Sequence, residues 1–499
     1  MADLSRFAGP TNMNGNPLFT PTNIIEAGGV RPHRWSSSIG SLMRLSVLCT
    51  ATLTTMLGLS SCACQRAGSP RIQPVAIPTT WDCRPVARGG TLCVLTDTDV
   101  HAAIFGIQVS GGSMSDAPGQ PGISHLAEHI LMRGIRDEGD KSPNPNLALA
   151  ISSISGRTRD DFSLYGGSIP RAALSDVFAL FAHEFDRRAR GAIEANEVRD
   201  EAQIVMREAS DSSSVPAAME RARLGSMAAS CPLRSYPGLD ESYDAQASPT
   251  DIARALTKRL ASSRFHVFVI GNVSWQVAHR ETMPLWTLLD AWPVRAPLMV
   301  DFKAVRDVCA TEAATPIELP ATTNFISWTW ALTPGPAGDD AEVQLAATLL
   351  DDKRSVVWRE LGERLHSLDT FTCSTSETSA SAWIQCRLVP SPSTNLDDLQ
   401  ASAAALWPHA IDELATMAQA ARQSKKELRR DVLESLSGLV SRVMIAAECT
   451  ELGREPNCEQ AYLSDLDKAS PEGIARAGHR WLSLDKALIH FHRAGSKAQ

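Results

Sequence analysis

The sequence has no surplus of positive charge. Its 499 residues include 48 Lys and Arg against 56 Asp and Glu, which gives a formal net charge of −8. It also has no dense basic run and no basic stripe with interleaved aromatic residues. Proteins that bind nucleic acids hold the phosphate backbone mainly with clustered Lys and Arg. Nucleic acid is therefore excluded as an expected partner.

The N-terminal region contains no apolar run long enough for a typical membrane span. The run Leu45–Leu59 follows Arg44 and is shorter than the roughly 20 residues that a spanning helix needs, but it suits the apolar centre of a signal peptide. It leads to Cys62 in the sequence Leu-Ser-Ser-Cys, which resembles a bacterial lipobox. The resemblance implies a lipoprotein signal peptide over residues 43–62 with the lipid on Cys62. Ala63, where an aspartate would retain the protein, implies an outer-membrane anchor in the cell envelope, facing the periplasm. The alternative is a buried apolar helix followed by an unrelated cysteine.

Length and composition predict two folded domains. Residues 1–42 are rich in Asn, Pro, Gly and Ser without any period, which indicates a disordered leader or a mis-called start. Residues 63–78 are expected to form a tether. The rest of the chain is too long for one core, and its 43% hydrophobic and 21% charged residues are typical of globular proteins. Prolines near residues 291–315 predict a linker between domains at 79–290 and 316–499.

Both halves predict the same order of elements: strand, helix, strand, helices, strand. In the first half, the pattern predicts a hairpin of strands at 91–99 and 102–110, further strands at 161–169 and 265–270, and helices at 123–133, 146–153, 172–185, 194–210 and 214–224. In the second half it predicts strands at 324–332, 382–388 and 487–491, and helices at 341–350, 396–421, 424–447 and 471–482. The predicted fold class is therefore α+β, with two similar domains that each pack helices on a mostly antiparallel sheet.

The cysteines outside the signal region favour an oxidising compartment. Three pairs lie close in the sequence and are predicted to form local disulfides, and two further cysteines are a possible fourth pair. The pairs are Cys83 with Cys93, Cys373 with Cys386, and Cys449 with Cys458, and the remaining two are Cys231 and Cys309. The alternative is a set of reduced, half-buried thiols.

The chemistry is concentrated in two predicted helices. His125 and His129 are four residues apart in the first helix, so both imidazoles face one side and can bind one metal ion. Glu128 lies beside them, where it can act as a general base. A catalytic zinc site needs a third protein ligand, and the acidic helix at 194–210 carries Glu201 and Glu208 on one face. Each helix alone has a simpler interpretation. The first could be a structural helix with an acidic residue beside its histidines, and the second could be a helix whose acidic face is solvated.

These residues resemble the pitrilysin, insulinase and mitochondrial processing peptidase family, whose inverted zinc motif is H-x-x-E-H. In that family the third ligand is a glutamate a little under eighty residues further on, and here the difference is 208 − 129 = 79. The resemblance implies one Zn²⁺ per chain held by His125, His129 and Glu208, with Glu128 as catalytic base and Glu201 as an auxiliary catalytic acid. Imidazole and carboxylate also accept other first-row metals, so the residues alone leave the metal identity open.

The resemblance continues after the zinc motif. Thr158, Asp161, Ser163 and Tyr165 resemble the family's threonine, aspartate, threonine and tyrosine pattern, whereas Ser155 replaces the usual asparagine on the strand that binds substrate. The implied activity is that of a zinc metalloendopeptidase, and the implied substrate is a flexible peptide or unfolded segment that adds to a sheet edge.

The second half departs from self-sufficient members of the family. Those members hold the substrate carbonyl with an arginine and, seven residues later, a tyrosine, where this sequence has Gly362 and Asp369. A shifted alignment brings Arg359 or Arg364 to the arginine position, but no shift supplies the tyrosine. The resemblance then implies the zinc-bearing subunit of a two-chain enzyme, whose homologous partner chain supplies both residues. The alternative is a noncatalytic assembly or peptide-binding subunit of an envelope complex.

Overall fold

The structure is a computed structural model that describes residues 35–36, 80–116, 120, 122–211, 247–293, 317–321, 323–332, 340–377 and 382–494. The predicted signal peptide with Cys62, the tether, the helix at 214–224, and Cys231 with Cys309 lie outside the described residues. So do nearly all of the predicted leader and of the linker.

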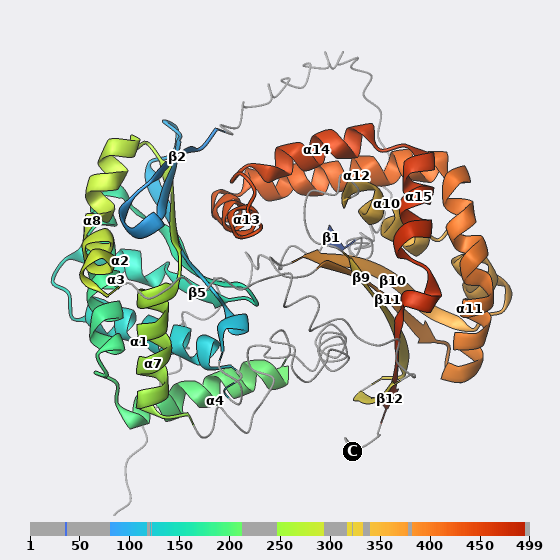
Figure 1. Ribbon diagram of the computed structural model, residues 1–499, viewed down its shortest axis with the longest axis horizontal. Helices are drawn as coiled ribbons and strands as arrows, with labels where there is room; N and C mark the ends of the chain where they lie inside the picture. The colour runs from blue at the N-terminus through green and yellow to red at the C-terminus, as the bar shows by residue number, and fades with distance from the viewer. Residues whose placement is uncertain are drawn as a thin grey trace, which may run out of the picture. The chain divides into compact units, whose positions relative to one another are not determined.

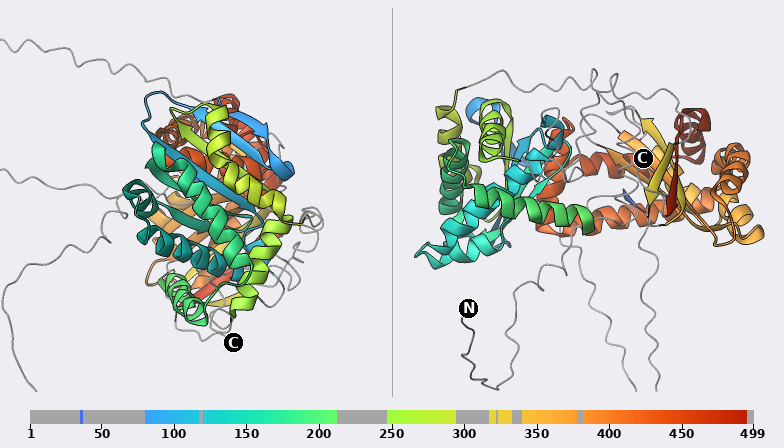
Figure 2. Two further views of the ribbon diagram at one scale, coloured as in Figure 1. Left: turned by 90° about the vertical axis from the view of Figure 1, so that its left-hand side faces the viewer. Right: turned by 90° about the horizontal axis from the view of Figure 1, so that it is seen from below.

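The first half contains a six-stranded sheet in the order β2-β3-β7-β4-β6-β5 (Figure 1). Its strands are β2 (Asp82–Pro85), β3 (Thr91–Thr96), β4 (Ala102–Ser110), β5 (Ser155–Thr158), β6 (Phe162–Pro170) and β7 (Phe265–Gly271). Its helices are α1 (Ile123–Asp140), α2 (Pro145–Ser152), α3 (Leu174–Ala189), α4 (Ala195–Asp211), α7 (Pro249–Ser262) and α8 (Trp275–Ala291). The helices face the viewer in Figure 2 (left) with strands behind them, and one apolar core joins both layers.

The second half contains another six-stranded sheet, in the order β1-β10-β11-β9-β12-β8. Its strands are β1 (Trp35–Ser36), β8 (Ile317–Ala321), β9 (Phe325–Leu332), β10 (Leu368–Glu377), β11 (Ala382–Pro390) and β12 (Leu488–Ala494). Its helical elements are α10 (Asp340–Asp351), the π-helical turn η7 (Trp358–Arg364), α11 (Leu396–Glu413), α12 (Ala418–Ser437), α13 (Leu439–Glu451), α14 (Cys458–Lys468) and α15 (Pro471–Trp481). The predicted α+β fold class is confirmed.

The two sheets share a five-strand topology. In the first, β3 runs parallel to β7, and β7-β4-β6-β5 continue antiparallel. In the second, β8 runs parallel to β12, and β12-β9-β11-β10 continue antiparallel. In chain order each strand of the first set corresponds to one of the second, so α1 and α10 occupy equivalent places after the second strand.

The predicted hairpin of residues 91–99 and 102–110 is wrong. Both strands exist, but β7 lies between them and pairs with each. All seven residues of β7 are buried, as is typical of a central strand that is covered on both faces. Insertion between β3 and β4 gives β7 a pairing strand on each side, which a two-stranded hairpin of β3 and β4 would not provide.

The predicted helix at 424–447 is also wrong as a single element. The chain breaks at Gly438, which has an extended backbone (φ −84°, ψ 123°) between α12 and α13. Downstream of this break, α13 packs against β4, β6 and β7 of the first sheet, on the face opposite its helices. Gly106 on β4 permits this contact, because a Cβ there would lie 2.4 Å from Val443 Cγ1.

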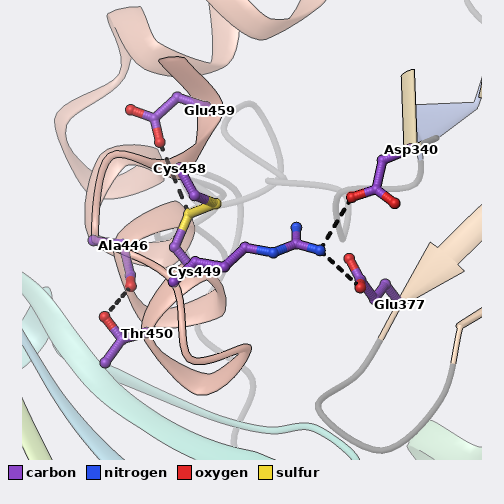
Figure 3. Close-up of a disulfide and its surroundings, with 8 residues drawn as sticks. Asp340, Glu377, Ala446, Cys449, Thr450, Cys458 and Glu459 are labelled. Atoms are coloured by element: carbon purple, nitrogen blue, oxygen red, sulfur yellow. Dashed lines mark hydrogen bonds and ion pairs between the residues drawn. A yellow bond between two sulfur atoms is a disulfide. The ribbon is translucent and has the colours of Figure 1, made fainter. Parts of the chain in front are cut away.

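The three predicted disulfides are confirmed. Cys83 faces Cys93 across β2 and β3, and Cys373 faces Cys386 across β10 and β11. The third links Cys449 on α13 to Cys458 at the start of α14, with Glu459 next to it (Figure 3). Because both sulfurs of the third pair are bonded to each other, this cysteine and glutamate cluster offers no thiolate to a metal ion.

Candidate metal centre

The helix α1 is held rigidly at its start. Gly122 adopts a left-handed conformation (φ 87°), and the Asp116 carboxylate accepts hydrogen bonds from the backbone N–H groups of Gly122 (2.9 Å) and Ser124 (3.1 Å). Leu126 and Ile130 are fully buried in the core. This packing leaves His125 and His129 together on one side, with ring centroids 4.8 Å apart.

The helix α4 supplies the predicted third ligand. Val198, Ala202 and Val205 pack into the first core, which turns Glu201 and Glu208 toward α1. Glu208 Oε2 lies 3.6 Å from His125 Nε2 and 3.5 Å from His129 Nε2. The structure therefore brings the three predicted ligands together, although Glu208 is 79 residues beyond His129 in the sequence.

Glu201 lies on the other side of the same imidazole. Its Oε2 is 3.2 Å from His129 Nδ1, and its Oε1 is 3.4 Å from Arg133 Nη1. A carboxylate at the second nitrogen of a ligating histidine fixes the ring orientation and the tautomer. This geometry suits an orienting group for His129, whereas the sequence suggested an auxiliary catalytic acid.

Glu128 is almost fully enclosed, with 5% exposure. Its Oε2 lies 4.0 Å from His125 Nε2 and accepts a hydrogen bond from Thr158 Oγ1 (3.2 Å). Burial raises the pKa of Glu128 above its usual range. A carboxylate with a raised pKa beside two imidazoles is suited to accept and return a proton near neutral pH.

The electrostatics of the two histidines differ. Burial and the neighbouring His129 lower the pKa of His125 to about 4, which keeps its imidazole neutral. For His129, burial acts in the opposite direction to the hydrogen bonds with Glu201 and Glu208, and these bonds prevail and raise the pKa to about 10. The hydrogen bond with His129 lowers the pKa of Glu208. Cation binding must therefore displace a proton from His129.

The donor set fits a zinc ion. Two neutral imidazole nitrogens and one carboxylate oxygen are the usual protein ligands of a catalytic zinc with an open fourth position. His125 Nδ1 is buried and, within the described ranges, has no hydrogen-bond partner. Nε2 is thus the nitrogen that His125 directs toward Glu208 and His129.

Comparison with known proteins gives a family match for the region that contains this site. Residues 93–232, which include both helices, match the family described as insulinase (peptidase family M16). This match confirms the family resemblance. No curated protein matches the chain by sequence.

Solved structures share the fold of this chain. A protease from Helicobacter pylori is 14% identical with a TM-score of 0.68, over 83% of this chain and 100% of the other. A peptidase M16 inactive domain from Pseudomonas fluorescens is 12% identical with a TM-score of 0.65, over 84% and 99%. The first half of the periplasmic protease PqqL from Escherichia coli is 14% identical with a TM-score of 0.59, over 83% and 91%.

Among the residues that the structure describes in the second half, none replaces the missing arginine and tyrosine. Gly362 lies in η7, where a Cβ would come within 2.6 Å of the Trp358 ring, and Asp369 is the second residue of β10. Arg359 is paired with Glu413 at 2.5 Å, and Arg364 is paired with Glu360. The hydroxyl of Tyr462 donates to Gln344 (2.9 Å), and Tyr236 and Tyr243 lie outside the described residues.

Two residues at the site had no role in the sequence analysis. Thr158 was noted only as part of a resemblance, and its hydrogen bond to Glu128 depends on the placement of β5 beside α1. Asp116 caps α1 from outside the helix, and the sequence carries no signal that links it to Gly122.

Proposed function

We propose that the chain is a zinc-dependent endopeptidase that cleaves flexible peptides or unfolded segments. The observation that carries this proposal is the convergence of His125 Nε2 and His129 Nε2 on Glu208 Oε2, at 3.6 and 3.5 Å, next to buried Glu128. The match to the insulinase family supports a peptidase, and two imidazoles with a carboxylate are a donor set that suits zinc.

The zinc ion, when bound, polarises the scissile carbonyl and makes water more acidic. Glu128 accepts the proton of the attacking water and returns it to the leaving amine. Glu201 keeps His129 oriented through its Nδ1 atom. The substrate adds as a strand to β5, which ends the described first sheet and lies against α1.

The chain acts, in this proposal, as the zinc-bearing subunit of a two-chain enzyme. The ion pairs of Arg359 and Arg364 within the second half support a partner that supplies the arginine and tyrosine. The chain covers 48% of the complete PqqL protease and 91% of its first half.

The proposed location is the bacterial cell envelope. A lipid on Cys62 would anchor the chain, preferably to the outer membrane facing the periplasm. The confirmed disulfides agree with an oxidising compartment. None of the described helices combines the length and the apolar character that a membrane crossing requires.

A second candidate is a noncatalytic assembly or peptide-binding subunit. The missing arginine and tyrosine favour it, and so does the similar fold of a domain described as inactive. Glu128 argues against it, because a scaffold has no need for a buried carboxylate between two metal ligands.

The decisive experiment compares wild type with Glu128→Gln and with Glu138→Gln. Glu138 is the matched control, because it lies on α1 but pairs with Lys141 at the far end. We expect about one zinc per chain in all three and peptide cleavage that is lost only in Glu128→Gln or after chelation. The assay is run with the chain alone and with the product of the gene next to its own added as the candidate partner chain. Bound zinc without cleavage in either condition would establish the noncatalytic subunit instead.

A further inference from the structure

A chain of hydrogen bonds runs behind Glu128 into the interior of the first half. Arg259 Nη1 donates to Ser163 Oγ (2.9 Å), Ser163 Oγ and Thr158 Oγ1 are 3.0 Å apart, and Thr158 Oγ1 donates to Glu128 Oε2 (3.2 Å). A guanidinium only donates and an ionised carboxylate only accepts. Each hydroxyl in between therefore accepts one bond and donates the next, so the relay has a single direction from Arg259 to Glu128.

The fold fixes every member of this relay. Thr158 and Ser163 are opposite residues on the antiparallel strands β5 and β6, which brings their hydroxyls together. Arg259 comes from the last turn of α7, which packs against α1. On the opposite side of the carboxylate, Gly156 touches Glu128 so closely that a Cβ would lie 2.3 Å from Oε1. Thr158 therefore holds Oε2, and Gly156 leaves no room for a side chain beside Oε1.

Arg259 is an unusual residue for a structural core. Its exposure is 3%, it forms no ion pair with any carboxylate of the described chain, and its charge favours the ionised forms of the nearby buried groups Asp116, Glu128 and Tyr165. A buried charge without an ionic partner is costly. Such a cost is typical of functional sites rather than of stabilising contacts.

We infer that Arg259 and Ser163 are positioning residues that act through Thr158 to hold the Glu128 carboxylate in its productive orientation. This inference rests on the proposed function for the role of Glu128 as the base. Orientation has a large effect on rate, since a misplacement of about 1 Å costs on the order of a hundredfold. The relay leaves the three metal ligands untouched.

The test uses a matched pair of variants in the full chain. Thr158→Val removes the hydroxyl at constant shape, and Thr158→Ser keeps it. On the peptide that wild type cleaves fastest, we expect Thr158→Val to lower kcat about tenfold to a hundredfold with KM and zinc content little changed. Thr158→Ser should restore most of kcat. Equal kcat values in wild type and Thr158→Val would overturn the inference.

A second readout does not depend on activity. Ser163→Ala is made in wild type and in a Glu128→Ala background, and thermal unfolding is measured for all four chains. If the relay joins the two sites, the Tm loss caused by Ser163→Ala is smaller when Glu128 is already absent, and the part that remains comes from the unpaired Arg259 Nη1. Equal Tm losses in the two backgrounds would overturn the relay even in a chain that cleaves no peptide. Absence of cleavage by wild type would refute only the proposed function.

Discussion

The two halves of the chain share a strand topology but differ at equivalent helices. In the first half, α1 carries two histidines and a glutamate toward α4. In the second half, α10 is buried on most sides and contributes mainly alanine, leucine and valine to its core. The comparison teaches that the fold provides a helix at this place, and that a few side chains decide whether it forms a metal site or packs a core.

The largest loss of zinc and activity is expected when a histidine that distinguishes α1 from α10 is removed. His129→Ala should reduce zinc to near zero and peptide cleavage below detection, because a two-ligand site binds zinc poorly. The control is His479→Ala in the second half, an exposed histidine that pairs with Asp412. Metal analysis of both purified chains checks this, and zinc retained at full content by His129→Ala would exclude the proposed ligand set.

The disulfides allow a second comparison of the halves. Cys386 is fully buried and Cys373 is 4% exposed, whereas Cys83 is only half-buried. Replacing Cys373 and Cys386 by alanine should lower the free energy of unfolding by about 2–4 kcal/mol. A mild reductant should open the pair Cys83–Cys93 before Cys373–Cys386. Denaturant unfolding and mass spectrometry of trapped thiols check both statements, and the reverse order of reduction would contradict the buried position of the second pair.

Buried Glu451 connects α13 of the second half to the first sheet. It accepts hydrogen bonds from Gln108 Nε2 (2.7 Å) and Ser110 Oγ (2.9 Å), and Asp161 and Arg264 lie near it. Burial, aided by the charge of Asp161, raises the pKa of Glu451 from 4.5 to about 7. The folded protein therefore keeps a proton that the unfolded chain releases, and stability falls as pH rises from about 4.5 through about 7.

The variant Glu451→Gln should remove this pH dependence. Relative to wild type at pH 8, we expect a gain in the free energy of unfolding of up to roughly 3 kcal/mol. At pH 4 the two chains should have nearly equal stability. Unfolding curves across this pH range measure the difference between the chains, and a difference that stays constant with pH would show that Glu451 does not titrate in the folded state.

The sequence predicted the local parts of this structure better than the long-range ones. The helix around His125 and His129 and the three disulfides depend on spacing within one segment, and the structure has them. The insertion of β7 between β3 and β4 depends on a pairing across more than 150 residues, which no local period reveals. The helix α7 was missed although Ser248 and Asp251 form a capping box and Pro249 lies in the first turn, which are signals that the sequence carries.

The site shows the same division between local and long-range information. A helical period of seven residues places Glu201 and Glu208 on one face, but only packing of α4 against α1 decides that Glu208 meets both Nε2 atoms. The relay behind Glu128 joins α1, the β5–β6 strands and α7. Arg259 therefore gave no signal in the sequence, because its partner Ser163 is 96 residues away.

The smallest expected effect concerns Arg359, the residue that a shifted alignment would use to hold substrate. Its guanidinium is paired with Glu413 and is half-exposed. An exposed ion pair contributes at most about 1 kcal/mol, so Arg359→Met should lower stability slightly. If the chain works in the proposed two-chain enzyme, Arg359→Met should leave kcat and KM unchanged, because in that proposal the partner supplies the arginine. Steady-state cleavage of peptide checks this, with Arg364→Met as the parallel variant. A large rise in KM for Arg359→Met would mean that the second half binds substrate itself. The proposal that a partner chain supplies the arginine would then be wrong.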